Sequence, residues 1–331
     1  MSLFKSKQPV QTASTGPDYY FLDRIAPTIS IEAAAHLKAV KAALAERPVT
    51  VLSGGLDPRA NDNFTLYRDK GHFFAKGTPH ENFFAELHGH REMKNQPLTA
   101  LPLAGYLGDL QTFEDYARSA TVYHDGDGQP IYRVDRDERG RVSAINYFAG
   151  GQPVRVDTYD QHQRLLMSEQ FGATANSAQL VDGRDAPTVH SIMSRTLYSE
   201  AGRPVFAQTF SPSELWLLDD HAVPVRLFQT EAALMAGWLM DHVDRHNHLY
   251  VAADTPIFAQ LASYDKLREH LIPIVQDKLD PAVLAGTPFT EILVSEGLNA
   301  SDFTESAKQI TTMPNWIGFK PNTGWSVFKH N

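Results

Sequence analysis

The feature of this 331-residue chain that most limits its fold is a run of evenly spaced turns between about residues 121 and 171. Four segments of this run alternate apolar and polar residues with a period of two, as half-buried strands do: residues 131–134, 142–148, 154–159 and 165–171. The turn clusters between them end at Gly128, Gly140, Gly151 and Gln163, at spacings of 12, 11 and 12 residues. Glycine supplies the positive φ that a tight hairpin needs. The pattern predicts an antiparallel meander, which residues 193–198 and 204–210 continue.

Patterns typical of an α/β fold lie on both sides of the hairpins. Before them, the sequence predicts strands at residues 19–25 and 49–52, with a helix at residues 31–46 between them. Ser30 is the expected N-cap, and the helix presents one apolar stripe: Ala33, Leu37, Val40 and Leu44. Residues 61–121 show no clear period. Strand, helix, strand is the opening of a parallel sheet covered by helices.

The α/β pattern returns after residue 211. Strands are expected at residues 223–228, 249–253, 271–275 and 292–294, and helices at residues 231–243, 264–270 and 301–309. Pro273 predicts that its strand lies at an edge or is distorted, because proline cannot donate to a sheet ladder. The sequence therefore predicts a discontinuous Rossmann-like α/β domain at 19–105 and 211–331, an inserted antiparallel β domain at 106–210, and a flexible arm at 1–18.

Composition narrows the function classes. Thirty basic and 39 acidic residues give a net charge of −9, which argues against a nucleic-acid binder. The absence of cysteine excludes disulfides, thiolate catalysis and cysteine-ligated zinc. No stretch approaches 18 consecutive apolar residues, and no secretory signal opens the chain, so we expect a cytoplasmic protein without a transmembrane segment.

Two stretches are rich in metal-ligating residue types. They contain His80, His88 and His90 with Glu81, Glu86 and Glu92, and His242, His246 and His248. His242 and His246 have the spacing of one helix face, but no HExxH motif is present. We interpret the first stretch as a solvated loop and the second as a polar helix terminus, and we expect no metal and no cofactor. The Ser53–Gly54–Gly55 sequence is interpreted as a turn, because it lacks the remaining residues of a phosphate-binding loop. No GxSxG elbow is present to support serine-hydrolase chemistry.

Taken together, the layout resembles the N-terminal half of GT-B glycosyltransferases of the wall-teichoic-acid and accessory-Sec adhesin type. The segments that carry the resemblance are residues 123–171, 210–216, 250–254, 291–296 and 312–314. The resemblance implies a Rossmann-like acceptor domain interrupted by an antiparallel β domain. Two features depart from active members: the loop at residues 27–31 lacks glycine, and residues 276–278 lack the family's histidine. The chain also stops at Asn331, where the resemblance would require a second, donor-binding domain.

These departures lead to the hypothesis of a glycosyltransferase-like protein that is not catalytic alone. It would bind a glycosyl acceptor, polymer or protein, or a full-length glycosyltransferase in a hetero-oligomer; a homo-oligomer through the β domain is the alternative assembly. Peripheral attachment at the inner face of the membrane would fit this setting. The candidate acceptor- or partner-binding residues are Arg133, Tyr147, Arg155 and Tyr159.

Two other functions remain open at this point. The first is an active glycosyltransferase, truncated or completed by a partner chain, that uses a nucleotide sugar. In that case polar residues at or just after strand ends would line the cleft: Asp254, Gln276, Ser295 and Glu296. The second is a β-repeat interaction module unrelated to sugar transfer.

Overall fold

A computed structural model describes residues 17–26, 28–44, 47–57, 60–89, 111–115, 119–160, 162–174, 189–243, 247–276, 279, 281–286 and 288–314. The chain divides into two units, one formed by Met1–Glu86 with Glu231–Asn331 and the other by Leu87–Thr230. The expected flexible arm lies outside the described residues except for its last two, and Asp18 already begins the first strand. Within the described residues, no helix is both long enough and apolar enough to cross a bilayer.

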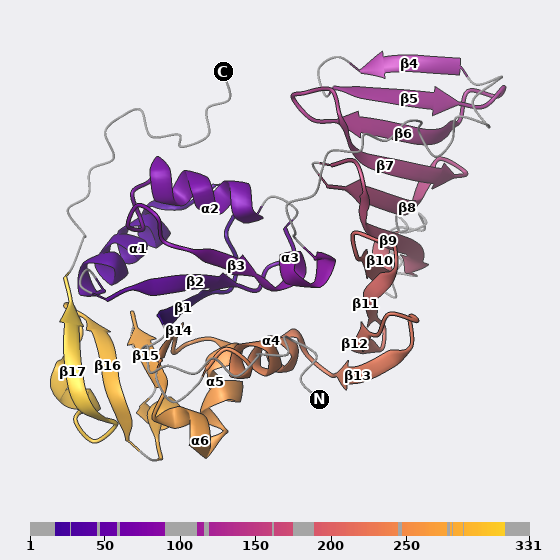
Figure 1. Ribbon diagram of the computed structural model, residues 1–331. Coiled ribbons are helices and arrows are strands. Elements are labelled where there is room, and N and C mark those ends of the chain that lie inside the picture. Colours follow the sequence, from indigo (N-terminus) through magenta and orange to yellow (C-terminus); the bar gives the residue numbers. More distant parts are fainter. Residues whose placement is uncertain are drawn as a thin grey trace, which may run out of the picture. The chain divides into compact units, whose positions relative to one another are not determined.

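The first unit is built on a seven-stranded parallel sheet (Figure 1). Its order is β17-β16-β15-β14-β1-β2-β3, which is a doubly wound order with one added strand. The strands are β1 (Asp18–Leu22), β2 (Val49–Ser53), β3 (His80–Asn82), β14 (Leu249–Ala252), β15 (Leu271–Val275), β16 (Phe289–Ser295) and β17 (Ala307–Met313). The expected α/β fold class is therefore confirmed.

Helices cover both faces of this sheet (Figure 1). They are α1 (Ile31–Ala43), α2 (Ala60–Asp69), α3 (Phe83–His88), α4 (Glu231–Met240), α5 (Pro256–Ala262) and α6 (Asp265–Arg268). One core joins α1 and α2 to the sheet through Leu37, Val40, Phe64 and Tyr250, all buried. On the other face Phe258 of α5 packs against Phe289 of β16, with 5.8 Å between ring centroids. Two 3₁₀ turns, Pro281–Leu284 and Ala300–Phe303, complete the unit.

Local sequence explains where several of these elements begin. The Ala33 backbone N–H donates to the Ser30 hydroxyl at 3.1 Å, so Ser30 caps α1 as expected. The stripe predicted for α1 holds at Leu37, Val40 and Leu44, but Ala34 rather than Ala33 is buried. Thr255 caps α5 in the same way, with Pro256 at the first helical position.

Two assignments in the parallel unit were wrong, and a third was wrong in one of its two alternatives. The segment interpreted as patternless contains α2, β3 and α3, and the stripe Ala60, Phe64 and Tyr67 carried the missed helical spacing. β15 lies between β14 and β16, so it is not an edge strand, and its ladder with β16 covers only Ile274 and Val275, beyond Pro273, as a strand distorted by proline would. The helix expected at residues 301–309 is a 3₁₀ turn followed by β17. The β-branched residues of β17, Ile310 to Thr312, favour a strand.

The second unit contains a ten-stranded antiparallel meander, whose order from β13 to β4 follows the sequence throughout. Its strands are β4 (Gln111–Asp115), β5 (Ala120–His124), β6 (Pro130–Arg136), β7 (Val142–Ala149), β8 (Gln152–Tyr159), β9 (Leu165–Thr174), β10 (Val189–Tyr198), β11 (Pro204–Phe210), β12 (Ser213–Leu218) and β13 (Pro224–Phe228). The predicted hairpins are confirmed, and a core cluster around Tyr132, Val134 and Ile145 packs between them.

A five-residue turn recurs in this sheet. In three of the predicted turns an aspartate opens the loop, and its carboxylate accepts from the backbone N–H groups two and four residues later: Asp125, Asp137 and Asp160. The fourth position has a positive φ and is Gly128, Gly140 or Gln163. The side chain of the first residue and the conformation of the fourth thus fix the hairpin register.

The same turn explains where the boundary of the sheet was misjudged. Asp219 opens a further turn and accepts from the His221 and Val223 backbone N–H groups at 2.8 and 3.0 Å. Ala222, with a φ of 60°, stands at the position of the usual glycine, which hid the turn from the sequence reading. The strand near residues 223–228 is β13 and pairs antiparallel with β12, so it does not mark the return of the parallel sheet.

Candidate functional site

The strand order of the parallel sheet reverses between β1 and β14. In open α/β sheets, ligands bind outside the carboxyl ends of the strands at such a switch point. Asp23 and Arg24 follow β1 there, and Asp254 follows β14 two residues after its end. Gln276 follows β15, and Ser295 with Glu296 ends β16, so the four residues expected along a cleft share this edge.

The contacts of these four residues differ. The Gln276 side-chain amide lies 2.8 Å from His36 Nε2 on α1, and the same nitrogen is 3.5 Å from the Tyr20 hydroxyl. Gln276 therefore ties the end of β15 to α1. Asp254 and Glu296 are exposed, and Ser295 is half-buried.

A buried polar network holds the ends of β2 and β3. Ser53 Oγ lies 2.9 Å from His80 Nε2, and His80 Nδ1 lies 2.8 Å from Asn61 Oδ1. Since the Asn61 oxygen can only accept, Nδ1 carries the proton and Ser53 donates to Nε2. Asn82 donates to Ser53 Oγ at 2.9 Å, so this hydroxyl donates to His80 and accepts from Asn82. Ser53 is 1% exposed, so this arrangement is a support beneath the site rather than an accessible nucleophile.

The two glycines after β2 are enclosed by side chains. A Cβ at Gly54 would lie 2.6 Å from the Met235 sulfur, and a Cβ at Gly55 would lie 2.9 Å from Cγ of Arg24. Asn82 also donates to the Gly55 carbonyl at 3.1 Å. The absence of side chains at Gly54 and Gly55 thus serves close packing within the protein, in line with the turn predicted there.

The carboxyl edge of the sheet has an acidic character. Among the described residues within two positions after the strands, Asp23, Asp254 and Glu296 are acidic and Arg24 is basic. Burial and the charge of Glu231 raise the pKa of Asp23 above its ordinary value. Cations and N–H groups stabilise an anionic diphosphate. The carboxylates at this edge would repel it.

Replacing Asp23 with asparagine is expected to raise the melting temperature of the protein at pH 7. The raised pKa means that folding disfavours the charged carboxylate, so the wild-type protein loses stability as the pH rises through that pKa. At pH 3 the carboxyl group is protonated in both the folded and the unfolded state, and the gain should vanish. Thermal unfolding at the two pH values checks this, and a variant less stable than wild type at pH 7 would contradict it.

The expected binding residues of the antiparallel sheet form two separate groups. The Tyr147 hydroxyl donates to Asp157 Oδ2 at 3.1 Å, and the Arg155 guanidinium donates to both Asp157 oxygens at 2.7 and 2.8 Å. Arg155 also lies over the Tyr147 ring, 5.3 Å from its centroid. Tyr159 is buried nearby, and burial raises the pKa of its phenol. Tyr147, Arg155 and Tyr159 thus belong to one cluster, organised by Asp157.

Arg133 does not belong to that cluster. Tyr132 is paired with Tyr147 across β6 and β7, so these two side chains share a face, and Arg133 points to the opposite face. There it pairs with Asp135 at 2.6 Å, and Asn146 donates to the same carboxylate. Arg133 therefore lies on the opposite face of the sheet from Tyr147 and Arg155, because adjacent residues of a strand alternate between faces.

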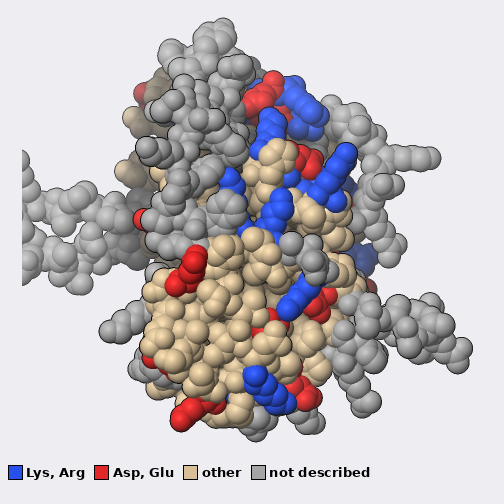
Figure 2. All heavy atoms as spheres, turned by 90° about the vertical axis from the view of Figure 1, so that its left-hand side faces the viewer, with Lys and Arg blue, Asp and Glu red and all other residues tan. Residues whose placement is uncertain are grey.

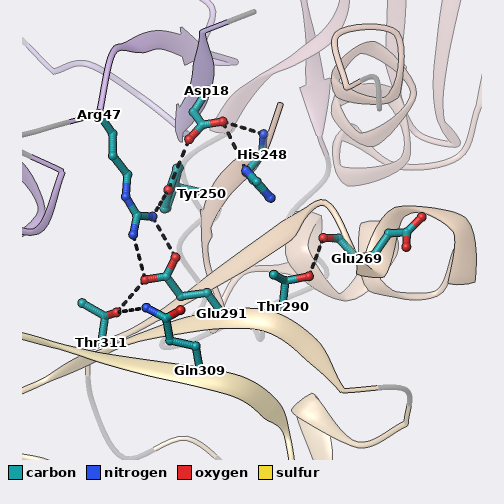
Figure 3. Close-up of polar contacts among 9 residues, drawn as sticks. All are labelled: Asp18, Arg47, His248, Tyr250, Glu269, Thr290, Glu291, Gln309 and Thr311. Atoms are coloured by element: carbon teal, nitrogen blue, oxygen red, sulfur yellow. Dashed lines mark hydrogen bonds and ion pairs between the residues drawn. The ribbon is translucent and has the colours of Figure 1, made fainter. Parts of the chain in front are cut away.

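A polar network that sequence reasoning missed lies at the amino end of the parallel sheet (Figure 3). Arg47, just before β2, donates to both oxygens of Glu291 on β16 at 2.7 and 3.1 Å and also to the Tyr250 hydroxyl. Thr311 donates to Glu291 at 2.6 Å, and Tyr250 donates to Asp18 at 3.4 Å. The network joins five segments that are remote in sequence, so no local pattern could reveal it.

One group of described residues has the composition of a metal site. The ligand atoms of Glu81, Glu86 and His242 lie within 4.8 Å of one another. Glu81 and Glu86 come from the first histidine- and glutamate-rich stretch, and His242 comes from the second. The fold therefore joins two stretches that the sequence reading had kept apart.

Comparisons with known proteins place the chain by its fold. No family model and no curated protein matches the sequence. Among solved structures, a variant of S. aureus TarM in complex with Fondaparinux, alpha-GlcNAc-glycerol and UDP matches with a TM-score of 0.61 and 11% identity, covering 91% of this chain and 62% of that chain. The pneumococcal O-GlcNAc transferase GtfA in complex with UDP and GlcNAc matches with a TM-score of 0.56 and 12% identity, over 90% and 60% of the two chains.

A third match is the Glycosylation Associate Protein (Gap123) complex from Streptococcus agalactiae, with a TM-score of 0.57, 11% identity, and coverage of 89% of this chain and 58% of that chain. The chain thus spans about 60% of the length of the structures it matches. The expected resemblance is confirmed: this chain has the fold of the N-terminal part of GT-B glycosyltransferases such as TarM and GtfA.

Proposed function

We propose that this chain is a glycosyltransferase-like protein that does not transfer sugar by itself and acts by pairing with an active glycosyltransferase. The observation that carries the proposal is the acidic carboxyl edge of the parallel sheet, where Asp23, Asp254 and Glu296 follow the strands. Transfer from a nucleotide sugar needs positive groups around the departing diphosphate. We propose that the protein takes part in the glycosylation of a cell-surface polymer or adhesin.

Assembly is a recurrent property of the structures that share this fold. The GtfA/B complex bound to UDP and GlcNAc and the Gap123 complex are both described as complexes. The present chain has a surface that suits such pairing. β13 is the last strand in the order of the ten-stranded sheet, so its outer side carries no further strand among the described residues. Edge strands can be extended by a strand of another chain.

The side chains of this edge are unusually apolar for an exposed strand. Val223, Val225 and Leu227 are 52%, 44% and 40% exposed. Val225 and Leu227 belong to β13, and Val223 directly precedes it. Together with the open strand edge they form the docking surface that we assign to the partner. The cluster of Tyr147, Arg155 and Tyr159 is the candidate for contact with an acceptor, and Arg133 would contribute only on the opposite face.

Two measurements test the proposal. The isolated chain should release no UDP from UDP-GlcNAc above background, and a tagged chain purified from its native cells should bring a full-length GT-B glycosyltransferase with it. Replacing Val225 and Leu227 with lysine should abolish that co-purification, because it adds two charges to the docking surface. The matched control is Val154→Lys, which alters a comparably exposed valine on the interior strand β8.

Two outcomes would overturn the pairing function. Turnover of UDP-GlcNAc by the chain alone would favour the active transferase instead, with Asp254, Gln276, Ser295 and Glu296 along its cleft. Purification of the chain without any glycosyltransferase would count equally against it. The third possibility was a β-repeat module alone. It is disfavoured, because the chain also contains a seven-stranded parallel sheet.

A peripheral position at the inner face of a membrane is part of the same proposal. Figure 2 shows several Lys and Arg side chains on the upper half of one face, with Asp and Glu side chains among them. Helix α1 carries Lys38 and Lys41, and burial together with the charge of Lys41 lowers the pKa of Lys38. Such basic groups are what an anionic lipid surface or an anionic polymer would attract.

A further inference from the structure

We propose that Glu81, Glu86 and His242 bind a divalent transition-metal cation, with zinc as the best fit. The three residues come from β3, α3 and the segment after α4, and all belong to the parallel-sheet unit. Imidazole and carboxylate groups together are typical zinc ligands. The site is independent of the pairing function argued above, since it involves neither β13 nor the residues Asp23, Asp254 and Glu296 on which that proposal rests.

The geometry of His242 carries the proposal. Its Nδ1 lies 3.0 Å from the Trp238 carbonyl oxygen, which can only accept a hydrogen bond. Nδ1 therefore carries the ring proton, and in the neutral ring Nε2 presents a lone pair. That lone pair faces Glu81 Oε2 at 3.3 Å, so two acceptors point at each other. A cation between them, either a proton or a metal ion, resolves this contact.

The separation of the ligand atoms suits a metal ion. Zinc bonds to nitrogen and oxygen of about 2.0–2.1 Å in a tetrahedral arrangement place neighbouring ligand atoms about 3.3 Å apart. The distance between His242 Nε2 and Glu81 Oε2 has this value. The ligand atom of Glu86 completes a triangle in which no separation exceeds 4.8 Å. A small rotation of the Glu86 side chain, which is half-buried, would bring it to bonding distance.

Trp238 orients two of the three ligands. Besides accepting from His242, it donates its indole N–H to Glu86 Oε2 at 3.0 Å. Its ring meets the His242 ring edge to face, with 4.9 Å between centroids, and Tyr19 meets the same imidazole from another element at 5.7 Å. Trp238 is fully buried, so these contacts fix the ligands before any ion arrives. Such outer hydrogen bonds are a regular property of zinc sites.

Exposure is graded across the site. His242 is 6% exposed, whereas the side chain of Glu81 is 38% exposed. An ion can therefore enter from the side of the glutamates, and three protein ligands leave a fourth position for water. The parallel-sheet unit consists of two chain segments. Glu86 is the last residue of the first segment, and α4 begins the second segment at Glu231. A bound ion would cross-link these two segments, which lie about 160 residues apart in the sequence.

The experiment is a calorimetric titration of the chelator-treated full chain with Zn²⁺, followed by the absorption spectrum of the Co²⁺-loaded protein. We expect saturation at one ion per chain, a higher melting temperature with Zn²⁺, and cobalt bands of tetrahedral intensity. Glu81→Gln and Glu86→Gln should each weaken Zn²⁺ binding by at least about tenfold, because an amide is a poorer ligand than a carboxylate. Both variants keep a hydrogen-bonding side chain at partly exposed positions, so both should fold.

His270→Gln is the matched control. His270 Nε2 lies 3.5 Å from Glu269, so it reproduces the histidine–glutamate contact, but neither residue belongs to the Glu81, Glu86 and His242 group. The control should bind Zn²⁺ as the wild type does. The proposal is overturned if the chain shows no saturable binding of Zn²⁺, in which case a proton alone links His242 to Glu81. Equal binding by the wild type and both glutamine variants would overturn it as well, by placing the ion elsewhere.

Discussion

Replacing Arg47 with methionine is expected to lower the free energy of unfolding of the parallel-sheet unit by about 3 kcal/mol. Glu291 is only 7% exposed, and Arg47 supplies the opposing charge for both of its oxygens. Burial opposes ionisation of Glu291, but hydrogen bonds from Arg47 and Thr311 outweigh it and lower the pKa of this carboxyl group. The low end of the usual range applies because Arg47 is 34% exposed and its charge is partly solvated.

Denaturation by urea, followed through hydrogen exchange of the β14 and β16 amides, measures this loss within the correct unit. Arg68→Met is the control, since Arg68 pairs with the exposed Asp69 and its removal should cost less than about 1 kcal/mol. The double variant Arg47→Met with Glu291→Gln should be more stable than Arg47→Met alone, because no buried charge is left uncompensated. An Arg47→Met protein within 1 kcal/mol of the wild type would contradict the role assigned to this pair.

Local signals in the sequence predicted local structure well. Ser30 caps α1, and the hairpin turns form where an aspartate precedes a glycine by three residues. In each case the residues that decide the conformation lie within a few positions of one another. The predictions failed where a special residue was replaced by an ordinary one, as with Ala222 in the last turn, or where tertiary contacts overrode a local preference, as with Pro273 in β15.

The sites depend on contacts that no local pattern encodes. The sequence placed Asp254, Gln276, Ser295 and Glu296 at one edge because parallel strands end together, and that reasoning needed only the element order. Glu81 and His242 meet through the position of α4 beside β3 and α3, which only the fold determines. Arg47 and Glu291 likewise meet because β2 and β16 belong to one sheet.

The amino and carboxyl ends of the strands in the parallel sheet differ in how their carboxylates are stabilised. At the amino end Glu291 accepts hydrogen bonds from Arg47, and Asp18 accepts one from the His248 backbone N–H. At the carboxyl end, burial and the charge of Glu231 raise the pKa of Asp23. Folding thus disfavours the charged form of Asp23 at the switch point, whereas it favours the charged forms of Glu291 and Asp18.

Lowering the pH from 7 to 5 is expected to cost the parallel-sheet unit about 2 kcal/mol through His80 alone. Burial lowers the pKa of His80 from 6.5 to about 4, and the charge of Glu81 offsets only part of that effect. Between these two values the unfolded chain binds a proton that the folded protein does not. Stability is therefore complete above pH 6.5 and falls as the pH decreases toward 4. Protonation would place an N–H on His80 Nε2, so Ser53 could no longer donate to it, which disturbs the support beneath Gly54 and Gly55.

His80→Gln isolates this contribution, because glutamine can donate and accept but does not titrate. The variant should be about 1–2 kcal/mol less stable than wild type at pH 7, since it loses hydrogen-bond geometry and the ring stacked on Phe64 at 4.4 Å. Its deficit should shrink by about 2 kcal/mol at pH 5, where only the wild-type protein carries the histidine penalty. His72→Asn is the control: His72 is exposed, takes no part in the hydrogen bonds of His80, and has a φ of 52°, which asparagine tolerates. A His80→Gln deficit that stays constant from pH 7 to pH 5 would show that folding does not lower the pKa of His80, and the direction assigned to the Ser53–His80 hydrogen bond would then have to be reversed at pH 5.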